Sequence, residues 1–216
     1  MKGNYLRLAL AWLVSVGVGC TGAPVRYYTL TPPPDKPLPA LETTLAIDVR
    51  VVHTPPQLNR SELMVRTGPT EVTLLDNERW ASPVNDEIKD ALRLELQRRL
   101  GRMTGLRPAF AKLTLDIDVQ HLEAEFGRYA LIEASWSATL SATGQRSNGA
   151  RVTTCTFQAD EKVHTGYAEI IEGYQREIAA LAEAIVAVLT SPASGSDASC
   201  QKSIEGSAGR AGPKDH

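Results

Sequence analysis

The sequence predicts an α/β fold in which a mixed β-sheet packs with two main amphipathic helices. Several runs alternate between apolar and polar residues, which is the period of a strand with one buried face. Two longer segments place apolar residues three and four positions apart, which is the period of a helix with one buried face. Neither kind of element can bury its apolar face alone, so we expect both helices to lie on the sheet.

The composition is that of one globular domain, which we place at residues 41–191. The chain has 216 residues, of which 43% are hydrophobic and 22% charged, and its formal net charge is −2. This balance provides no basic surface for phosphates, so we expect no nucleic-acid partner. The function must therefore be sought in local features of the chain.

Residues 1–19 have the three-part layout of a secretory signal peptide. Lys2 and Arg7 make its start positive, and residues 8–19 form an uncharged stretch that ends in small residues. A helix of that length spans about 18 Å, well short of the roughly 30 Å hydrocarbon core of a bilayer. A permanent transmembrane anchor is therefore disfavoured.

The end of this stretch resembles the lipobox of bacterial lipoproteins. Val18 and Gly19 are the small residues that precede the cysteine in that motif, although Gly17 stands where the pattern favours a larger aliphatic residue. The resemblance implies cleavage after Gly19, a diacylglyceryl group on the sulfur of Cys20 and acylation of its new amino group, for example by palmitate. Two or more acyl chains anchor a protein stably. The alternative is that Cys20 is a small residue near an ordinary cleavage site.

Residues 20–40 form the expected tether between this anchor and the domain. Thr21 follows the cysteine, and by resemblance to enteric lipoproteins it favours the periplasmic face of the outer membrane over the inner membrane. The five prolines between Thr31 and Pro39 predict an extended segment. Before them, residues 25–30 form a short β-prone run.

Two other cysteines remain if Cys20 carries lipid. Cys200 lies within residues 192–216, which have no hydrophobic period and which we expect to form a disordered tail. We therefore expect Cys155 and Cys200 to be free thiols. The alternative is a disulfide formed in an oxidising periplasm.

The first half of the domain predicts three strands and a helix. Residues 45–52 alternate, and residues 62–66 and 71–75 flank a Gly-Pro turn. Residues 83–103 carry an apolar stripe at every fourth position, with Ser82 as the expected cap and Gly105 as the expected stop.

The second half predicts a β-rich block and a closing helix. Residues 113–120 alternate and then shift phase, which indicates a bulge or bend, and a turn at Gly127-Arg128 leads into a strand over 130–140. Residues 152–163 continue the sheet. The segment 168–190 has the helical period until Pro192 ends it.

Motifs for catalysis and metal binding are missing. Three histidines, His53, His121 and His164, stand in strand-like or proline-flanked segments, and no nucleophile elbow, HExxH or phosphate loop occurs. Asp116 and Asp118 share a strand face, which we interpret as solvated rather than as a metal or glycosidase site. We expect no enzyme activity, no cofactor and no metal.

Three aromatic residues are candidates for contacts with a partner. Tyr27 and Tyr28 follow the tether, and Trp80 precedes the first long helix. Packing within the domain is the favoured interpretation for all three.

The order of these features resembles the ABC-type transport auxiliary lipoproteins, also called the paraquat-inducible protein C or YmbA family. The similarity rests on RYYTL, IDVRVV, PPQLNRSELMVR and ERWASPVNDEIKDALRLELQRRL, and it runs from about Arg26 to Leu189. It implies a three-layer, anticodon-binding-domain-like fold and no catalytic residue.

The resemblance also implies a function in the envelope. The protein would dock or tether an MCE/ABC-type transport system, which moves lipids or other hydrophobic molecules between membranes, at the outer membrane. Its partners would be an MCE-domain protein, the ABC permease and ATPase, and the bilayer, with a homo-oligomer left open. The alternatives are a lipoprotein that assists assembly or secretion of outer-membrane components, and a lipidated periplasmic enzyme.

Overall fold

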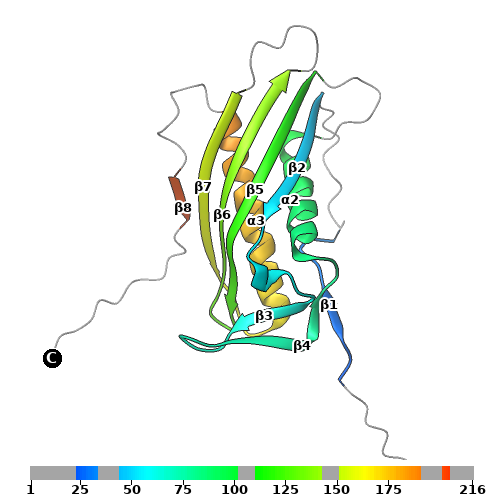
Figure 1. The fold of residues 1–216 in the computed structure, drawn as a ribbon, viewed down its shortest axis with the longest axis vertical. Helices are drawn as coiled ribbons and strands as arrows, with labels where there is room; N and C mark the ends of the chain where they lie inside the picture. Colours follow the sequence, from blue (N-terminus) through cyan, green and yellow to red (C-terminus); the bar gives the residue numbers. More distant parts are fainter. Residues whose placement is uncertain (1–22, 34–43, 102–109, 143–150, 191–200, 205–216) are drawn as a thin grey trace, which may run out of the picture.

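Eight strands form one mixed sheet and two helices cover it in the computed structural model, which describes residues 23–33, 44–101, 110–142, 151–190 and 201–204 (Figure 1). The strands are β1 (Arg26–Tyr28), β2 (Leu45–His53), β3 (Glu62–Arg66), β4 (Val72–Trp80), β5 (Ala111–Glu125), β6 (Tyr129–Ala142), β7 (Arg151–Lys162) and β8 (Gln201–Ile204). The helices are α2 (Val84–Leu100) and α3 (Tyr167–Thr190), and a single 3-10 turn, η1, spans Pro56–Leu58.

The sheet has the order β1-β4-β3-β5-β6-β7-β8, and β2 pairs with β5 off this path. Strands β5, β6 and β7 are antiparallel neighbours, whereas β1 with β4, β2 with β5 and β7 with β8 are parallel. Strand β2 lies along the first half of β5, and β3 meets its last residue, where Arg66 pairs with Glu125. The predicted α/β class with a mixed sheet and two main helices is confirmed.

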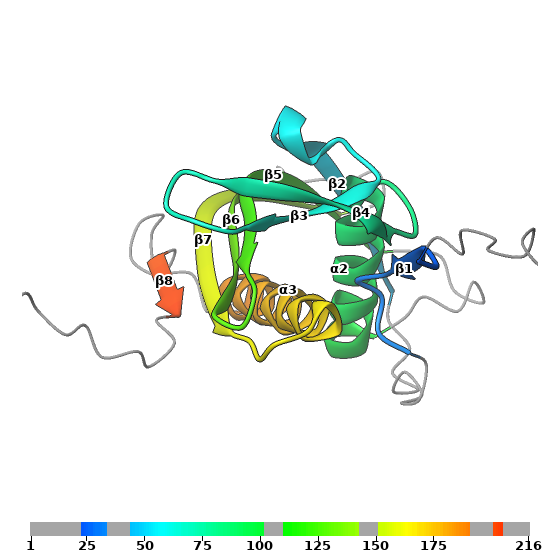
Figure 2. The same ribbon diagram turned by 90° about the horizontal axis from the view of Figure 1, so that it is seen from below.

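Both helices lie on the same face of the sheet (Figure 2). The described elements therefore form a sheet layer and a helix layer. The physical reason lies in the strands, since β5 turns Leu113, Leu115 and Ile117 into the core while Thr114 and Asp116 point the other way. A face lined with such polar side chains does not need a second layer to cover it.

The predicted irregularity in the long hairpin is also present. The register between β5 and β6 shifts between Val119 and His121, which marks a β-bulge, and the turn at Gly127 has φ of +71°. In the part of the hairpin before the bulge, Trp136 lies opposite Ile117 and is buried against the helices. The change of hydrophobic phase in the sequence thus corresponds to a change of pairing.

The first long helix differs from its predicted ends. It begins directly after Pro83, and Ser82 makes no capping bond to the helix backbone. Gly101, with φ of +86°, ends the helix, so the predicted stop at Gly105 is wrong. Gly105 itself lies outside the described residues.

Helix α3 approaches the sheet closely at a glycine. A Cβ placed on Gly173 would lie 2.7 Å from the Cγ1 of Val163 and 3.0 Å from the Cβ of Ala130. Only a residue without a side chain allows this helix to lie so close to β6 and the end of β7.

Two findings concern the cysteines and the C-terminal segment. Cys155 is disulfide-bonded, so the prediction of two free thiols is wrong for this residue; its partner lies outside the described residues. Part of the segment expected to be disordered forms β8, which pairs in parallel with β7, with Gln201 opposite Thr156. The rest of residues 192–216 lies outside the described part of the chain.

Candidate functional site

Two sequence segments that are far apart meet at the start of the domain. The RYYTL segment forms β1, which pairs in parallel with the end of β4, so that Arg26 lies opposite Glu78 and Tyr28 opposite Trp80. The chain then passes beside the start of α2. We call this arrangement the N-terminal clasp and define it by two glutamates, Glu78 and Glu87, and by the groups that bind them, which belong to Arg26, Tyr28, Thr29, Leu30 and Ser82.

The first glutamate of the clasp binds β1. Glu78 is almost fully buried, and its Oε1 accepts a hydrogen bond from Nε of Arg26 at 3.0 Å, while its Oε2 accepts one from the hydroxyl of Tyr28 at 2.7 Å. The second guanidinium nitrogen of Arg26 also binds Oε1. Burial acts to raise the pKa of Glu78, but these bonds to the ionised form outweigh it, and the net pKa is lowered. Glu78 is therefore a buried carboxylate.

The second glutamate binds the residues that follow β1. Oε2 of Glu87 accepts hydrogen bonds from the hydroxyl of Thr29 at 2.7 Å and the backbone N–H of Leu30 at 2.8 Å. Its Oε1 accepts two more from Ser82, from the hydroxyl at 2.7 Å and from the backbone N–H at 3.0 Å. One carboxylate thus joins the N-terminal segment to the entrance of α2.

The clasp also reaches α3. The amide nitrogen of Gln175 donates to the carbonyl of Thr29 at 3.2 Å, and the backbone N–H of Ala81 donates to the carbonyl of Tyr28 at 2.8 Å. Leu30 is completely buried at the end of this segment. The N-terminal segment is therefore fixed to the sheet and to both helices.

The structure separates the predicted contact residues. Tyr28 packs into the clasp, and Trp80 is only 7% exposed, with its ring centroid 6.4 Å from that of Tyr174. Tyr27 points away from the clasp and is 65% exposed, so of the three aromatic candidates it alone offers a large free surface. Cys20, the predicted lipidation site, lies outside the described residues.

Sequence analysis did not single out Glu78 and Glu87. Both lie inside the ERWASPVNDE segment, where acidic residues look like an ordinary polar surface. The donors beside the tether could have pointed to these glutamates. An arginine and several hydroxyl groups lie there, and buried carboxylates require such donors.

A small apolar pocket opens near the clasp, between η1, β3, β4 and the first turns of α3. Most of its lining is apolar or aromatic: Leu58, Leu63, Met64, Val65, Trp80, Leu122, Tyr167, Ile170 and Tyr174. Gln57 and Glu62 add polar groups. Such a lining can accept an apolar side chain but contributes no reactive group.

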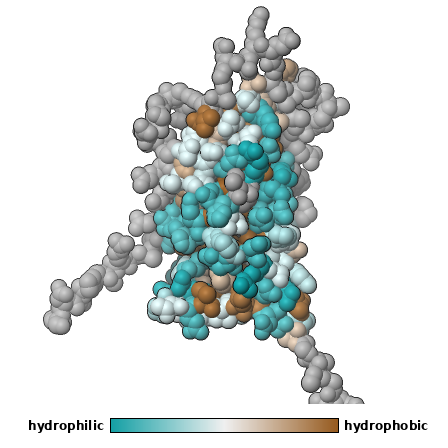
Figure 3. All heavy atoms as spheres, in the orientation of Figure 1, coloured by the Kyte–Doolittle hydropathy of each residue, from teal (hydrophilic) through white to brown (hydrophobic). Residues whose placement is uncertain are grey.

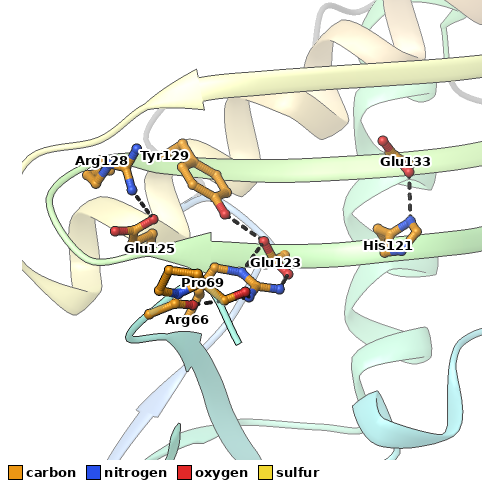
Figure 4. A network of polar contacts seen from close by, with 9 residues as sticks. Arg66, Pro69, His121, Glu123, Glu125, Arg128, Tyr129 and Glu133 are labelled. Carbon is orange, nitrogen blue, oxygen red and sulfur yellow. Dashed lines mark hydrogen bonds and ion pairs between the residues drawn. The ribbon is translucent and has the colours of Figure 1, made fainter. Parts of the chain in front are cut away.

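A polar network joins the β3–β4 hairpin to the long hairpin (Figure 4). Arg66 donates to both carboxylate oxygens of Glu123, with Nε at 2.7 Å from Oε1, and the hydroxyl of Tyr129 donates to the same carboxylate at 2.5 Å. The bonds from Arg66 lower the pKa of Glu123 despite partial burial, and burial together with the bond to Glu123 raises the pKa of Tyr129 to about 12. The network fixes the hairpin where only one residue pair connects β3 to β5.

Two of the polar residues considered for chemistry, Asp116 and His121, form structural pairs. Asp116 forms an ion pair with Arg50 of the neighbouring strand at 2.7 Å, and Nδ1 of His121 lies 2.6 Å from Oε2 of Glu133 across the hairpin. Within the described ranges, no group of three or more His, Cys, Asp or Glu residues is placed to hold a metal ion. In that same part of the chain, no helix is long and apolar enough to cross a membrane.

A match to a family model identifies the family of this chain. The model of the ABC-type transport auxiliary lipoprotein component matches residues 28–186. The chain belongs to this family. Membership associates it with an ABC-type transport system as an auxiliary component, and with the cell envelope as a lipoprotein.

One solved structure supports the fold of this family member. A crystal structure of an uncharacterised protein aligns with a TM-score of 0.58 and 19% identity, covering 77% of this chain and 99% of the other. A DUF330 protein from Xanthomonas campestris aligns at 19% identity over 76% of this chain and 90% of its own, with a TM-score of 0.44. A comparison with curated proteins finds no significant match.

Proposed function

We propose that this family member is a non-enzymatic outer-membrane lipoprotein that docks or tethers an MCE/ABC-type lipid transport system from the periplasmic face. The observation that carries this proposal is the family match over residues 28–186, which begins eight residues after the lipobox cysteine. The lipid would be carried by Cys20. The domain would supply the surface that meets the transporter.

The clasp supports the role of an anchored adaptor. Ala23, the first described residue, follows the predicted acylated residue by three positions, and Arg26, Tyr28, Thr29 and Leu30 are bound to Glu78 and Glu87. An anchor six residues before Arg26, the first bound residue of the clasp, holds the domain near the bilayer, because six residues span at most about 22 Å.

The polar interactions support a role without catalysis. The carboxylates of the clasp and of the β3–β4 network bind arginine, tyrosine, threonine or serine groups that belong to other elements of the fold. Such pairs stabilise the arrangement of strands and helices. They leave these carboxylates engaged rather than poised toward a substrate.

Co-purification tests the proposal. The full-length protein, expressed in its native envelope and extracted in mild detergent, should bring down an MCE-domain protein together with an ABC permease, identified by mass spectrometry along with bound lipids. A C20S variant, which cannot be acylated at that position, controls for the anchor. Recovery of the wild-type protein in acylated form without either transport component would contradict the proposed role.

A further inference from the structure

Large hydrophobic side chains are exposed mainly at one end of the domain. Seven are exposed among the described residues: Val25, Tyr27, Val72, Leu74, Phe110, Phe126 and Val152. Five of them belong to the β1 segment, to β4 and to the turn between β5 and β6, which lie together at the lower end in Figure 1. On the face shown in Figure 3, hydrophobic side chains likewise gather at this end, and the sheet above them is mainly hydrophilic.

The same end is where the chain approaches the predicted anchor. Strand β1 starts at the lower end in Figure 1, and Cys20 precedes Ala23 by three residues. At 3.3–3.6 Å per residue, the acylated residue would lie within about 11 Å of Ala23. A bilayer that holds the acyl chains must then lie close to this end of the domain.

We propose that this end of the domain, which we call the membrane-facing end and define by Val25, Tyr27, Val72, Leu74 and Phe126, rests in the headgroup region of the bilayer that carries the anchor. This inference rests on the proposed acylation of Cys20. The lipid chains restrict the domain to the membrane surface, and these side chains select which end of it faces the lipid.

The chemistry of this end fits a lipid surface. Tyrosine and phenylalanine suit the boundary between headgroups and acyl chains, where aromatic residues of membrane proteins gather. Arg26 and Arg128 have exposed side chains, at 61% and 67%, and long basic side chains can cover apolar surface while their charge stays among the headgroups. Both guanidinium groups are held by carboxylates of the fold, Glu78 and Glu125.

Phe126 and Arg26 are also held in place before any contact with lipid. The ring of Phe126 packs edge-on against Tyr167 with centroids 5.3 Å apart, and the guanidinium of Arg26 lies 5.9 Å from the centre of the same Tyr167 ring. Preorganised side chains lose little conformational entropy on binding, and the anchor keeps the surface at a high effective concentration. A modest apolar area is then enough to orient the domain.

The long hairpin provides a matched probe at the opposite end. Phe110 precedes β5 and Phe126 follows it, so at about 3.3 Å per residue the two rings are separated by roughly 50 Å of strand. Both are exposed, Phe110 at 63% and Phe126 at 45%. A membrane contact at one end should therefore leave the other in water.

Tryptophan quenching by brominated lipid tests the orientation. The full-length acylated protein is reconstituted into vesicles of phosphatidylethanolamine and phosphatidylglycerol, with or without dibrominated phosphatidylcholine, as the F126W, Y27W or F110W variant. Each variant adds the fluorescence of one tryptophan to the wild-type signal. Brominated lipid should quench most of this added fluorescence in F126W and Y27W, and little of it in F110W. The buried Trp80 and Trp136 contribute the same background to all three.

Intact mass and vesicle flotation distinguish a failure of the membrane-facing end from a failure of the proposed acylation of Cys20. Mature protein without acyl mass would overturn both the anchor and the membrane-facing end. Acylated, vesicle-bound F126W and Y27W proteins that are quenched no more than F110W would overturn the membrane-facing end alone. The Y27W variant guards against misfolding, because Tyr27 is 65% exposed.

Discussion

Glu78 and Glu177 are similarly hidden from solvent, at 4% and 1% exposure, yet they favour opposite protonation states. Glu78 receives hydrogen bonds from Arg26 and Tyr28, which favour its ionised form. Glu177 on α3 accepts a single bond, from the backbone N–H of Glu161 at 3.1 Å, and its Oε2 has no partner. Burial, reinforced by the nearby Glu161 and Asp160, raises the pKa of Glu177 to about 9. The available donors, rather than burial alone, decide the charge.

Replacing Glu78 with alanine should destabilise the domain. Truncation leaves the partly buried hydroxyl of Tyr28 without its acceptor, which typically costs about 1–3 kcal/mol of unfolding free energy, measurable by urea denaturation at pH 7. Because the pKa of Glu78 is lowered in the folded state, its contribution is present above the ordinary value of 4.5 and is lost as the pH falls below it. The difference between wild type and variant should therefore shrink in acid.

Asp76 on the same strand is the matched control for this experiment. It is exposed, so D76N should change the unfolding free energy by less than about 0.5 kcal/mol. An E78A protein as stable as D76N would show that the bonds to Glu78 contribute nothing to folding.

Replacing Glu177 with glutamine should change how stability depends on pH. A carboxyl group whose pKa is raised on folding holds its proton more tightly in the folded state, so the stability of the wild type falls between pH 4.5 and about 9. This loss is at most about 1.4 kcal/mol per pH unit. The E177Q variant lacks the titrating group and should gain stability relative to wild type as the pH rises through this window. Parallel stability curves for the two proteins would contradict the assignment.

At the scale of elements, periodicity predicted β5, β6, β7 and both helices, because each of them buries an apolar stripe. The end of β4 was missed since Asp76, Asn77, Glu78 and Arg79 carry no apolar alternation, and Glu78 faces inward only because β1 supplies its donors. The cap of α2 was missed for a related reason, as the Ser82 hydroxyl binds Glu87 instead of the helix backbone. Sequence periodicity detects apolar burial, whereas these features depend on polar partners distant in the chain.

The disulfide of Cys155 leads to a prediction about its partner cysteine. If Cys20 carries lipid, Cys200 is the remaining cysteine of the chain, and the register that places Gln201 opposite Thr156 is consistent with this pairing. Peptide mapping of the mature protein without reductant should recover a fragment that links Cys155 to Cys200 and that separates after reduction. A link from Cys155 to Cys20 would instead exclude acylation of that sulfur.

For the whole molecule, the Cys20→Ser change should remove the lipid and leave the fold intact. The first residue with a described side-chain bond in the clasp is Arg26, so we expect the bonds of the clasp to persist in this variant. Intact mass should show acylated protein for wild type and no acyl addition for C20S, and sucrose-gradient fractionation should show that C20S no longer sediments with the outer membrane. The C155S variant, which keeps the lipobox, should remain acylated.

The candidate site was predicted only in part, because some of its features are local in the sequence and others depend on contacts between distant residues. The lipobox is a local sequence pattern, and the lipidation of Cys20 stays a prediction from it. The clasp depends on contacts between residues about 50 positions apart. The exposure of Tyr27 depends on the pairing of β1 with β4, in which Arg26 and Tyr28 bind Glu78.

Strand β1 also has a consequence for how the protein withstands force. Its three residues pair in register and in parallel with β4, so a pull transmitted from the acylated end acts along the strand and shears its backbone bonds together instead of peeling them apart singly. Rupture would require Glu78 and Glu87 to release their donors in the same event. If the protein holds a transporter as proposed, a pull between the two would thus act on the clasp.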